Sequence, residues 1–275
     1  MREPRDLGLG IRDSESNSQG LAGALSMREP RVPGPRSPVP APPPARRQFL
    51  ALLLGAGAVL AVPPLRAQAA RYDFWFTRLK YDSGDWDVDA RMPSNLITSL
   101  IDYTTLRVDP VEHVLPLADP RMLAAPFCYL AGHKLVEFNP AERRNFERYV
   151  RSGGFVLVDD CNHDIDGLFA KSFEAQMAAI FGRDALKKLR NDHPLYRSFF
   201  RFPDGPPATG IELNGWGDDL VHDYLKGIEI DGRLGVLYSN KDYGCEWDYD
   251  WRNKRFLAED NTKFAVNIVM YALNS

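Results

Sequence analysis

The feature that most constrains the fold is a strand, a helix and a second strand joined by short links in the middle of the chain. Residues 127–131 form a short apolar run. Asn139-Pro140-Ala141-Glu142 then begins a helix, because Asn is a good N-cap, proline suits the first turn and glutamate at the third position returns a hydrogen bond. Gly153-Gly154 ends that helix, and residues 155–158 are apolar enough for a strand covered on both faces. This order predicts a βαβ unit and therefore an α/β fold with a mostly parallel sheet and helices on both faces.

The rest of the body supplies further elements of the same kind. Strands are expected at 72–79 and 113–117, and an apolar stripe after Pro93 indicates a helix. Helical patterns cover 169–181, 184–190 and 260–273. Asp231-Gly232 between two strand-like runs predicts a C-terminal β-hairpin, because this dipeptide suits the positive φ angles of a type I′ turn.

The first 69 residues have a different character. Residues 1–45 are rich in Pro, Gly, Ser and Arg, so we expect a disordered extension. Residues 46–69 combine Arg46-Arg47, an apolar run and Ala67-Gln68-Ala69, the order of a signal peptide. The paired arginines before Phe49-Leu50 resemble the twin-arginine motif, which predicts export of the folded protein to the periplasm. Residues 70–275 are then one α/β domain.

Two further expectations concern this leader. Met-Arg-Glu-Pro-Arg occurs at 1–5 and again at 27–31, which raises the hypothesis that Met27 is the true start. The apolar run of 49–62 is shorter than the roughly 20 residues of a membrane span. A membrane contact is therefore expected only through a signal segment that stays uncleaved.

The charge balance limits the partners. Residues 1–69 hold nine arginines, no lysine and five acids, which leaves 25 basic and 32 acidic residues in the body. A body with a net charge of −7 is not that of a protein that neutralises nucleic-acid phosphates, so we expect no nucleic-acid partner. An unknown small molecule or a periplasmic protein remains the expected partner.

Several motifs in the body resemble a known family. They follow one another along the chain as Gly84-Asp85-Trp86, Leu130-Ala131-Gly132-His133, Gly153-Gly154-Phe155, Asp159-Asp160-Cys161, Asp192-His193-Pro194, Asp242-Tyr243-Gly244-Cys245 with Trp247, and Asn267-Ile268-Val269-Met270-Tyr271-Ala272. Over about 72–274 they resemble an exported bacterial domain of unknown function, number 4159 of its series. That family is similar to the class I glutamine amidotransferase-like superfamily, which implies a three-layer flavodoxin-like fold. It implies no activity and no catalytic residues.

The superfamily comparison can be set against chemistry. Amidotransferases place a nucleophilic Cys on a glycine-flanked turn after a strand, with His and Glu later in the chain. Cys161 stands near that place, but the flanking glycines and a later His-x-Glu are missing. Thiol catalysis by Cys161 with His163 therefore competes with a structural role for a partly buried thiol. Three cysteines, Cys128, Cys161 and Cys245, permit at most one intramolecular disulfide.

The carboxylates after the central strand offer a second kind of site. No nucleotide, phosphate-loop or haem motif occurs, so no cofactor is evident except a divalent metal. Asp160-x-Asn162-x-Asp164-x-Asp166 starts like a calcium loop, but Ile165 and Lys171 replace the Gly and Glu that an EF-hand needs. Asp159 or Asp160 with His163, and His133 as a further candidate, can hold a metal in another geometry. The alternative is that the Asp pair accepts backbone N–H groups of the next segment.

Two acidic segments carry tryptophan. Asp85-Trp86 follows the first strand, and Asp242 and Trp247 lie in an aromatic, acidic loop at 242–251. Both segments suit a sugar or a cationic ligand, and both also suit a loop whose ring packs on the core.

Two classes of function stay open. The missing elbow glycines and His/Glu partner favour a non-catalytic periplasmic module that binds a ligand or a protein. The alternative is a periplasmic hydrolase, metal-assisted or not, acting on a glycan-related substrate, with Asp160 as base or metal ligand and His133 or His163 as acid.

Overall fold

The computed structural model describes residues 71–249 and 258–275. The predicted extension, signal peptide and alternative start lie outside these residues, as do Asp250 and Trp251 of the acidic aromatic segment. The elements are β1 (Thr77–Lys80), α2 (Met92–Tyr103), β2 (His113–Pro116), η1 (Pro120–Ala124), β3 (Cys128–Gly132), α3 (Pro140–Arg151), β4 (Val156–Asp160), α4 (Leu168–Phe181), β5 (Lys187–Lys188), η2 (Pro194–Arg197), α5 (Gly210–Leu213), β6 (Lys226–Ile230), β7 (Arg233–Ser239), α6 (Tyr243–Asp248) and α7 (Ala258–Asn274).

The strands form one open sheet in the order β2-β1-β3-β4-β7-β6-β5. The first five of these run parallel, whereas β6 is antiparallel to β7 and β5 is antiparallel to β6. The predicted α/β class with a mostly parallel sheet is therefore confirmed.

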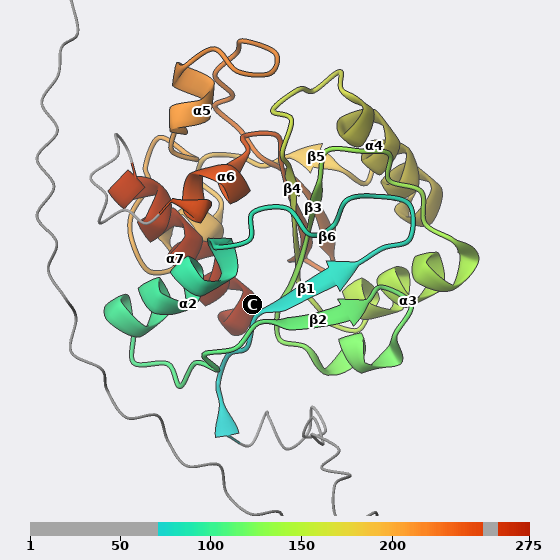
Figure 1. The fold of residues 1–275 in the computed structure, drawn as a ribbon, viewed down its shortest axis with the longest axis horizontal. Coiled ribbons are helices and arrows are strands. Elements are labelled where there is room, and N and C mark those ends of the chain that lie inside the picture. Colours follow the sequence, from blue (N-terminus) through green and yellow to red (C-terminus); the bar gives the residue numbers. More distant parts are fainter. Residues whose placement is uncertain (1–70, 250–257) are drawn as a thin grey trace, which may run out of the picture. The chain divides into compact units, whose positions relative to one another are not determined.

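Helices cover both faces of the sheet (Figure 1). Alternate residues of the central strands point to opposite faces, so that Tyr129 and Leu157 join the core beneath α2 and α7. Leu130 and Val158 point the other way and pack with Phe146 of α3 and other residues of α3 and α4. The central strands β3 and β4 are buried along their whole length, as their apolar sequences predict.

Local sequence signals explain the best predicted elements. At the start of α3 the Asn139 side chain accepts from the backbone N–H of Glu142, whose side chain accepts in return from the backbone N–H of Asn139. Gly153 follows α3 with a φ of 104° that an L-residue rarely adopts. Between β6 and β7, Asp231 and Gly232 have φ angles of 52° and 78°, as the predicted type I′ hairpin requires.

Two sequence predictions were wrong. The segment 184–190 is not a helix, because Gly182 ends α4 and the short piece that follows pairs with β6 as the two-residue edge strand β5. A seven-residue segment gains little from helix formation, whereas the sheet edge offers it a ladder. The start of the acidic aromatic segment is not a loop but the helix α6, capped by Asp242.

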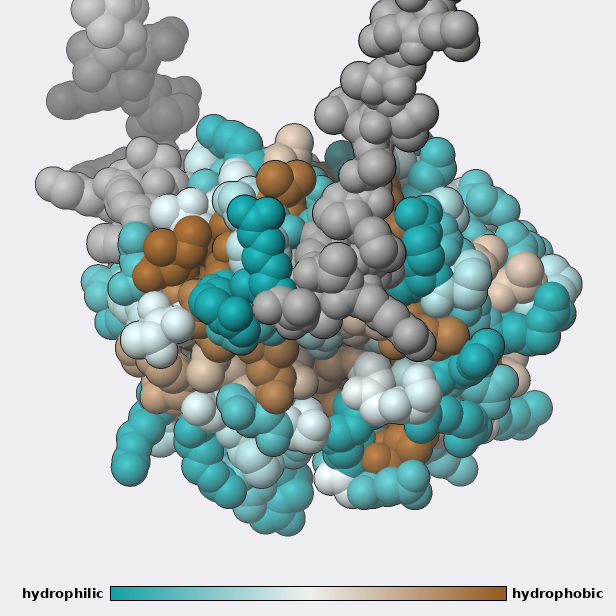
Figure 2. All heavy atoms as spheres, turned by 90° about the horizontal axis from the view of Figure 1, so that it is seen from below, coloured by the Kyte–Doolittle hydropathy of each residue, from teal (hydrophilic) through white to brown (hydrophobic). Residues whose placement is uncertain are grey.

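The surface drawn in Figure 2 shows hydrophobic residues in separate patches between hydrophilic side chains. Within the described part of the chain, no helix is both long enough and apolar enough to cross a membrane.

Candidate functional site

The polar residues of interest gather where parallel strands end. The chain leaves β1, β3, β4 and β7 at the same edge of the sheet, so four loops distant in sequence meet there. The register fixes their relative positions, with Gly132 beside Asp160 and Asp159 beside Ser239.

Asp159 and Asp160 are both fully buried, yet they accept hydrogen bonds from different segments of the chain. Asp159 accepts hydrogen bonds from the backbone N–H groups of Tyr243 (3.2 Å) and Gly244 (2.6 Å) at the start of α6. Burial raises the pKa of Asp159 to about 7, against the lowering effect of these bonds. Asp160 accepts from the backbone N–H of Asn162 and from the side chain of Asn240, and burial raises its pKa to about 6.

At the start of α6 lies a group of acids and thiols that we call the thiol–carboxylate cluster. Its members are Asp89, Asp159, Cys161, Asp242 and Cys245. The Cys161 thiol donates to one carboxylate oxygen of Asp89 and the Cys245 thiol to the other, each at 3.3 Å. Ligand atoms of Asp159, Cys161 and Asp242 lie within 4.8 Å of one another. Burial is the main cause that raises the pKa of every member, to about 9 for Asp242.

A buried arginine holds Asp89 in place. The Arg78 guanidinium donates to the carbonyl oxygens of Val88 (2.6 Å) and Asp89 (3.2 Å) and pairs with Glu112. The guanidinium carbon Cζ of Arg78 lies 5.5 Å from the ring centre of Tyr129. The acidic loop after β1 is thereby tied to the sheet, and Asp89 is presented to both thiols.

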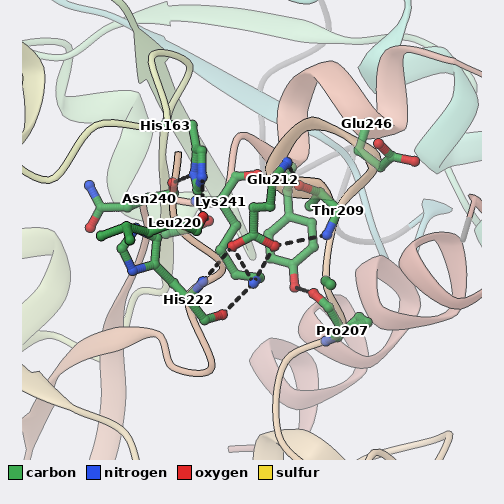
Figure 3. Close-up of polar contacts among 12 residues, drawn as sticks. His163, Pro207, Thr209, Glu212, Leu220, His222, Asn240, Lys241 and Glu246 are labelled. Carbon is green, nitrogen blue, oxygen red and sulfur yellow. Dashed lines mark hydrogen bonds and ion pairs between the residues drawn. The ribbon is translucent and has the colours of Figure 1, made fainter. Parts of the chain in front are cut away.

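His163 lies outside this cluster, in a buried polar network that includes Glu212 of α5 (Figure 3). Its Nδ1 faces the carbonyl oxygen of Asn240 at 2.5 Å and its Nε2 that of Leu220 at 2.8 Å. Both ring nitrogens therefore face backbone carbonyl oxygens, which engage the imidazole from two sides. Asp218 lies 3.5 Å from Nε2 and also contacts His222 at 2.9 Å.

The same network holds a buried ion pair. The Lys241 ammonium lies 2.6 Å from both carboxylate oxygens of Glu212 and also donates to the carbonyl of His222 (Figure 3). Neither charged side chain is exposed to solvent. Burial lowers the pKa of Lys241, and the charge of Glu212 opposes that effect.

His133 is on the solvent side of the strand ends. Its Nδ1 and its backbone N–H both contact the Asp85 carboxylate at 3.0 Å, which joins the loops after β1 and β3. Beside it lies a surface pocket of about 410 Å³, here called the rim pocket. It is lined by His133, Asn162, Asp164, Gly167, Leu168, Trp216 and Gly217.

The two tryptophans predicted to bind a ligand are not well exposed to solvent. Trp247 is 3% exposed, stacks on Tyr243 at 5.0 Å and donates to the carbonyl of Asn261, so its ring belongs to the core. Trp86 is half-buried under the ammonium of Lys80. Trp216, which the sequence did not single out, is 62% exposed.

A surface cavity of about 870 Å³ elsewhere on the molecule contains none of the predicted site residues. Among the residues that line it are Arg190, Arg197 and Arg201. Two of these are already engaged, since Arg190 pairs with the Asp192 carboxylate and Arg197 donates to the Asp192 carbonyl. We therefore place the candidate site at the strand ends.

The structure thus divides the predicted residues. Asp159, Cys161 and Asp242 come together, whereas Asp160 and His163 each have other partners and His133 pairs with Asp85. The sequence pointed to Asp89 only as one acid of the loop after the first strand, and it did not point to Tyr129 or Trp216. It treated Cys245 only as a possible disulfide partner. Alternation along β4 is the signal that separates Asp159 from Asp160.

The fold and these contacts define an α/β protein whose polar groups gather at the carboxyl ends of parallel strands. Residues 75–273 match the family described as Domain of unknown function (DUF4159), so the chain belongs to that family. No match was found among curated proteins.

Proposed function

We propose that this chain is an exported, non-catalytic module that binds a carbohydrate in the rim pocket. Trp216 carries this proposal. It is a largely exposed indole in a pocket shared with His133, Asn162 and Asp164. An exposed aromatic face stacks on the apolar face of a sugar, while nearby carboxylate, amide and imidazole groups bond to its hydroxyls.

The backbone supports a fixed position for this indole. Gly217 follows Trp216 with a φ of 70°, and a Cβ at Gly217 would lie 1.9 Å from the carbonyl oxygen of His163. Asp218 donates its backbone N–H to the same carbonyl at 2.9 Å. The loop is therefore packed closely on the segment after β4, which reduces the entropy lost on binding.

The strand order supports the finer fold assignment that we propose, a flavodoxin-like sheet of the class I glutamine amidotransferase-like superfamily. The parallel strands β2-β1-β3-β4-β7 follow the flavodoxin order, with β6 and β5 added at one edge. In that arrangement the order of the strands reverses between β1 and β3, and ligands bind at such a switch point. The Asp85–His133 pair lies at this point, next to the rim pocket.

The arrangement of the thiols counts against an amidotransferase-like reaction. The Cys161 thiol is 3% exposed and donates to Asp89, and burial among carboxylates raises its pKa well above the usual value. A reactive cysteine needs the opposite, a positive environment that favours the thiolate. Both ring nitrogens of His163 face backbone carbonyl oxygens rather than the Cys161 thiol.

The hydrolase alternative depends on Asp160 and receives less support. A pKa of about 6 suits a general base near neutral pH. Asp160 is fully buried, however, and both its oxygens accept hydrogen bonds from the protein. Its carboxylate is therefore not exposed to a substrate in the rim pocket.

Titration of the full chain with soluble N-acetylglucosamine oligosaccharides tests the binding proposal. We expect saturable binding measured by isothermal titration calorimetry, lost in Trp216→Ala and kept in Phe199→Ala, a matched change of an exposed aromatic residue outside the pocket. Equal binding by both variants, or release of reducing sugar by the wild type, would contradict the proposal.

Export is tested separately. We expect the protein in the periplasmic fraction and its retention in the cytoplasm after Arg46→Lys with Arg47→Lys, because the pathway reads the paired arginines. Unchanged export of that variant would remove the twin-arginine part of the proposal.

A further inference from the structure

The thiol–carboxylate cluster combines thiols and carboxylates, which bind metals in their deprotonated forms. We propose that it is a zinc site in which Cys161, Cys245, Asp89 and Asp242 are the ligands of one Zn²⁺ ion. Thiolate sulfur and carboxylate oxygen are both ordinary zinc ligands. The rim pocket shares no residue with it.

The two sulfur–oxygen distances in the cluster are those expected around a four-coordinate ion. Ligand atoms about 2.0–2.3 Å from a tetrahedral zinc lie roughly 3.3–3.8 Å from one another. Both sulfurs already lie 3.3 Å from an oxygen of Asp89. Asp242 lies close to the Cys161 thiol, because ligand atoms of Asp159, Cys161 and Asp242 lie within 4.8 Å of one another.

Asp159 has a different task. Its two oxygens accept from the N–H groups of Tyr243 and Gly244, which fixes α6 and, with it, Cys245. We therefore assign Asp159 as a positioning residue beside the ion. Such outer partners orient the ligands and affect metal affinity.

The composition of the cluster also favours a bound cation. Three carboxylates and two thiols are packed together, and the neighbouring guanidinium of Arg78 is engaged with Glu112 and backbone carbonyls. Deprotonating these buried groups without a counter-charge is unfavourable. A divalent ion supplies that charge and displaces the protons.

An independent observation points to a ligand in the cluster. Tyr129 is fully buried, and its hydroxyl has no hydrogen-bond partner among the described residues. That hydroxyl lies 2.5 Å from the place where a Gly244 Cβ would be, and an Asp89 oxygen lies 2.2 Å from the same point. A buried hydroxyl left without a partner is unfavourable, so its approach to Asp89 suits a donor to a metal-bound carboxylate.

The ligand types select the ion. Calcium and magnesium take oxygen ligands, and thiols next to a carboxylate favour zinc instead. Asp89 and Cys245 are half-buried, whereas Cys161 and Asp242 are buried, so the outer side of the cluster gives an ion its way in.

The test uses the full-length protein, reduced, stripped with a chelator, loaded with Zn²⁺ and separated from free ion. We expect stoichiometric zinc by elemental analysis, and a thiolate-to-metal charge-transfer band after loading with Co²⁺. Cys161→Ser and Cys245→Ser should each lower zinc affinity more than about tenfold, the loss that even an outer partner's removal gives. Cys128→Ser is the matched control, because that buried thiol packs on the opposite face of the sheet. Tyr129→Phe should weaken binding and leave the fold intact.

Three results would overturn the zinc site. The first is obtained on the wild-type protein with reduced thiols and needs no variant. It is either that the protein retains no zinc or that its cobalt form lacks the thiolate band. Another is a Cys161–Cys245 disulfide in the exported protein. The third is zinc retained by the double Cys→Ser variant and lost in His222→Ala, which would move the metal to His163, Asp218 and His222. Trp216→Ala should still retain zinc. The zinc site can therefore be confirmed even if the carbohydrate-binding proposal fails.

Discussion

The Asp159 carboxylate accepts a 2.6 Å hydrogen bond from the backbone N–H of Gly244, a residue 85 positions further along the chain. With the second bond from Tyr243, it joins the end of β4 to the first turn of α6. Neighbouring Asp160 makes no such bond and holds Asn162 and Asn240 instead. Adjacent carboxylates on one strand thus stabilise two different loops.

This relationship predicts the effect of Asp159→Asn. An asparagine has one oxygen and one NH2 group, so it satisfies only one of the two N–H donors and turns its own donor toward the other. We expect the free energy of unfolding, measured with urea on chelator-treated protein, to fall by about 1–3 kcal/mol. Asp166→Asn, at an exposed position, is the control and should change it by less than about 0.5 kcal/mol. Equal stability of the two variants would show that the contact to α6 contributes nothing.

Gly244→Ala separates packing from helix propensity. In an ordinary helix this change stabilises by about 1 kcal/mol. Here the new Cβ would lie 2.2 Å from an Asp89 oxygen and 2.5 Å from the Tyr129 hydroxyl, so the neighbours would have to move. We expect a net loss of about 1–3 kcal/mol in urea unfolding. A gain in stability would mean that Asp89 and Tyr129 do not approach Gly244 as closely as these distances require.

These contacts show what the sequence could and could not predict. The capping box at Asn139 and Glu142 and the Asp231-Gly232 turn act over a few residues, so the pattern alone is sufficient for both. Lys187 and Lys188 form an edge strand because β6 lies beside them, a fact that no local propensity contains.

The candidate site was predictable only in part for the same reason. Placing polar residues at the ends of 127–131 and 155–158 follows from the βαβ pattern. The pairing of Cys161 with Asp89 and of Asp89 with Cys245 spans 72 and 156 residues and depends on where Arg78 and Asp159 hold their loops. The spacing of residues in the sequence does not predict such long-range contacts.

The Lys241–Glu212 pair predicts a non-additive pair of substitutions. Lys241→Met leaves a buried carboxylate without its cation, and we expect a loss of about 3–5 kcal/mol in the free energy of unfolding. Lys241→Met with Glu212→Gln removes both charges and should be less destabilised than Lys241→Met alone. Arg190→Met, which removes an exposed pair with Asp192, is the control and should lose no more than about 1 kcal/mol. Additive losses in the double variant would contradict a direct interaction between Lys241 and Glu212.

His193 predicts a pH dependence of stability whose sign follows from its contacts. Its Nδ1 accepts from the backbone N–H of Leu195 at the start of η2, and burial lowers the pKa of His193 below its ordinary value. Between that lowered pKa and about 6.5 the unfolded chain binds more protons than the folded one, so stability falls as the pH falls through this window. His193→Asn keeps an acceptor at the cap without a titrating ring. We therefore expect the wild type to lose more stability than this variant between about pH 7 and about pH 5, measured as urea midpoints on chelator-treated protein. Parallel curves for the two proteins would show that protonation of His193 is not linked to folding.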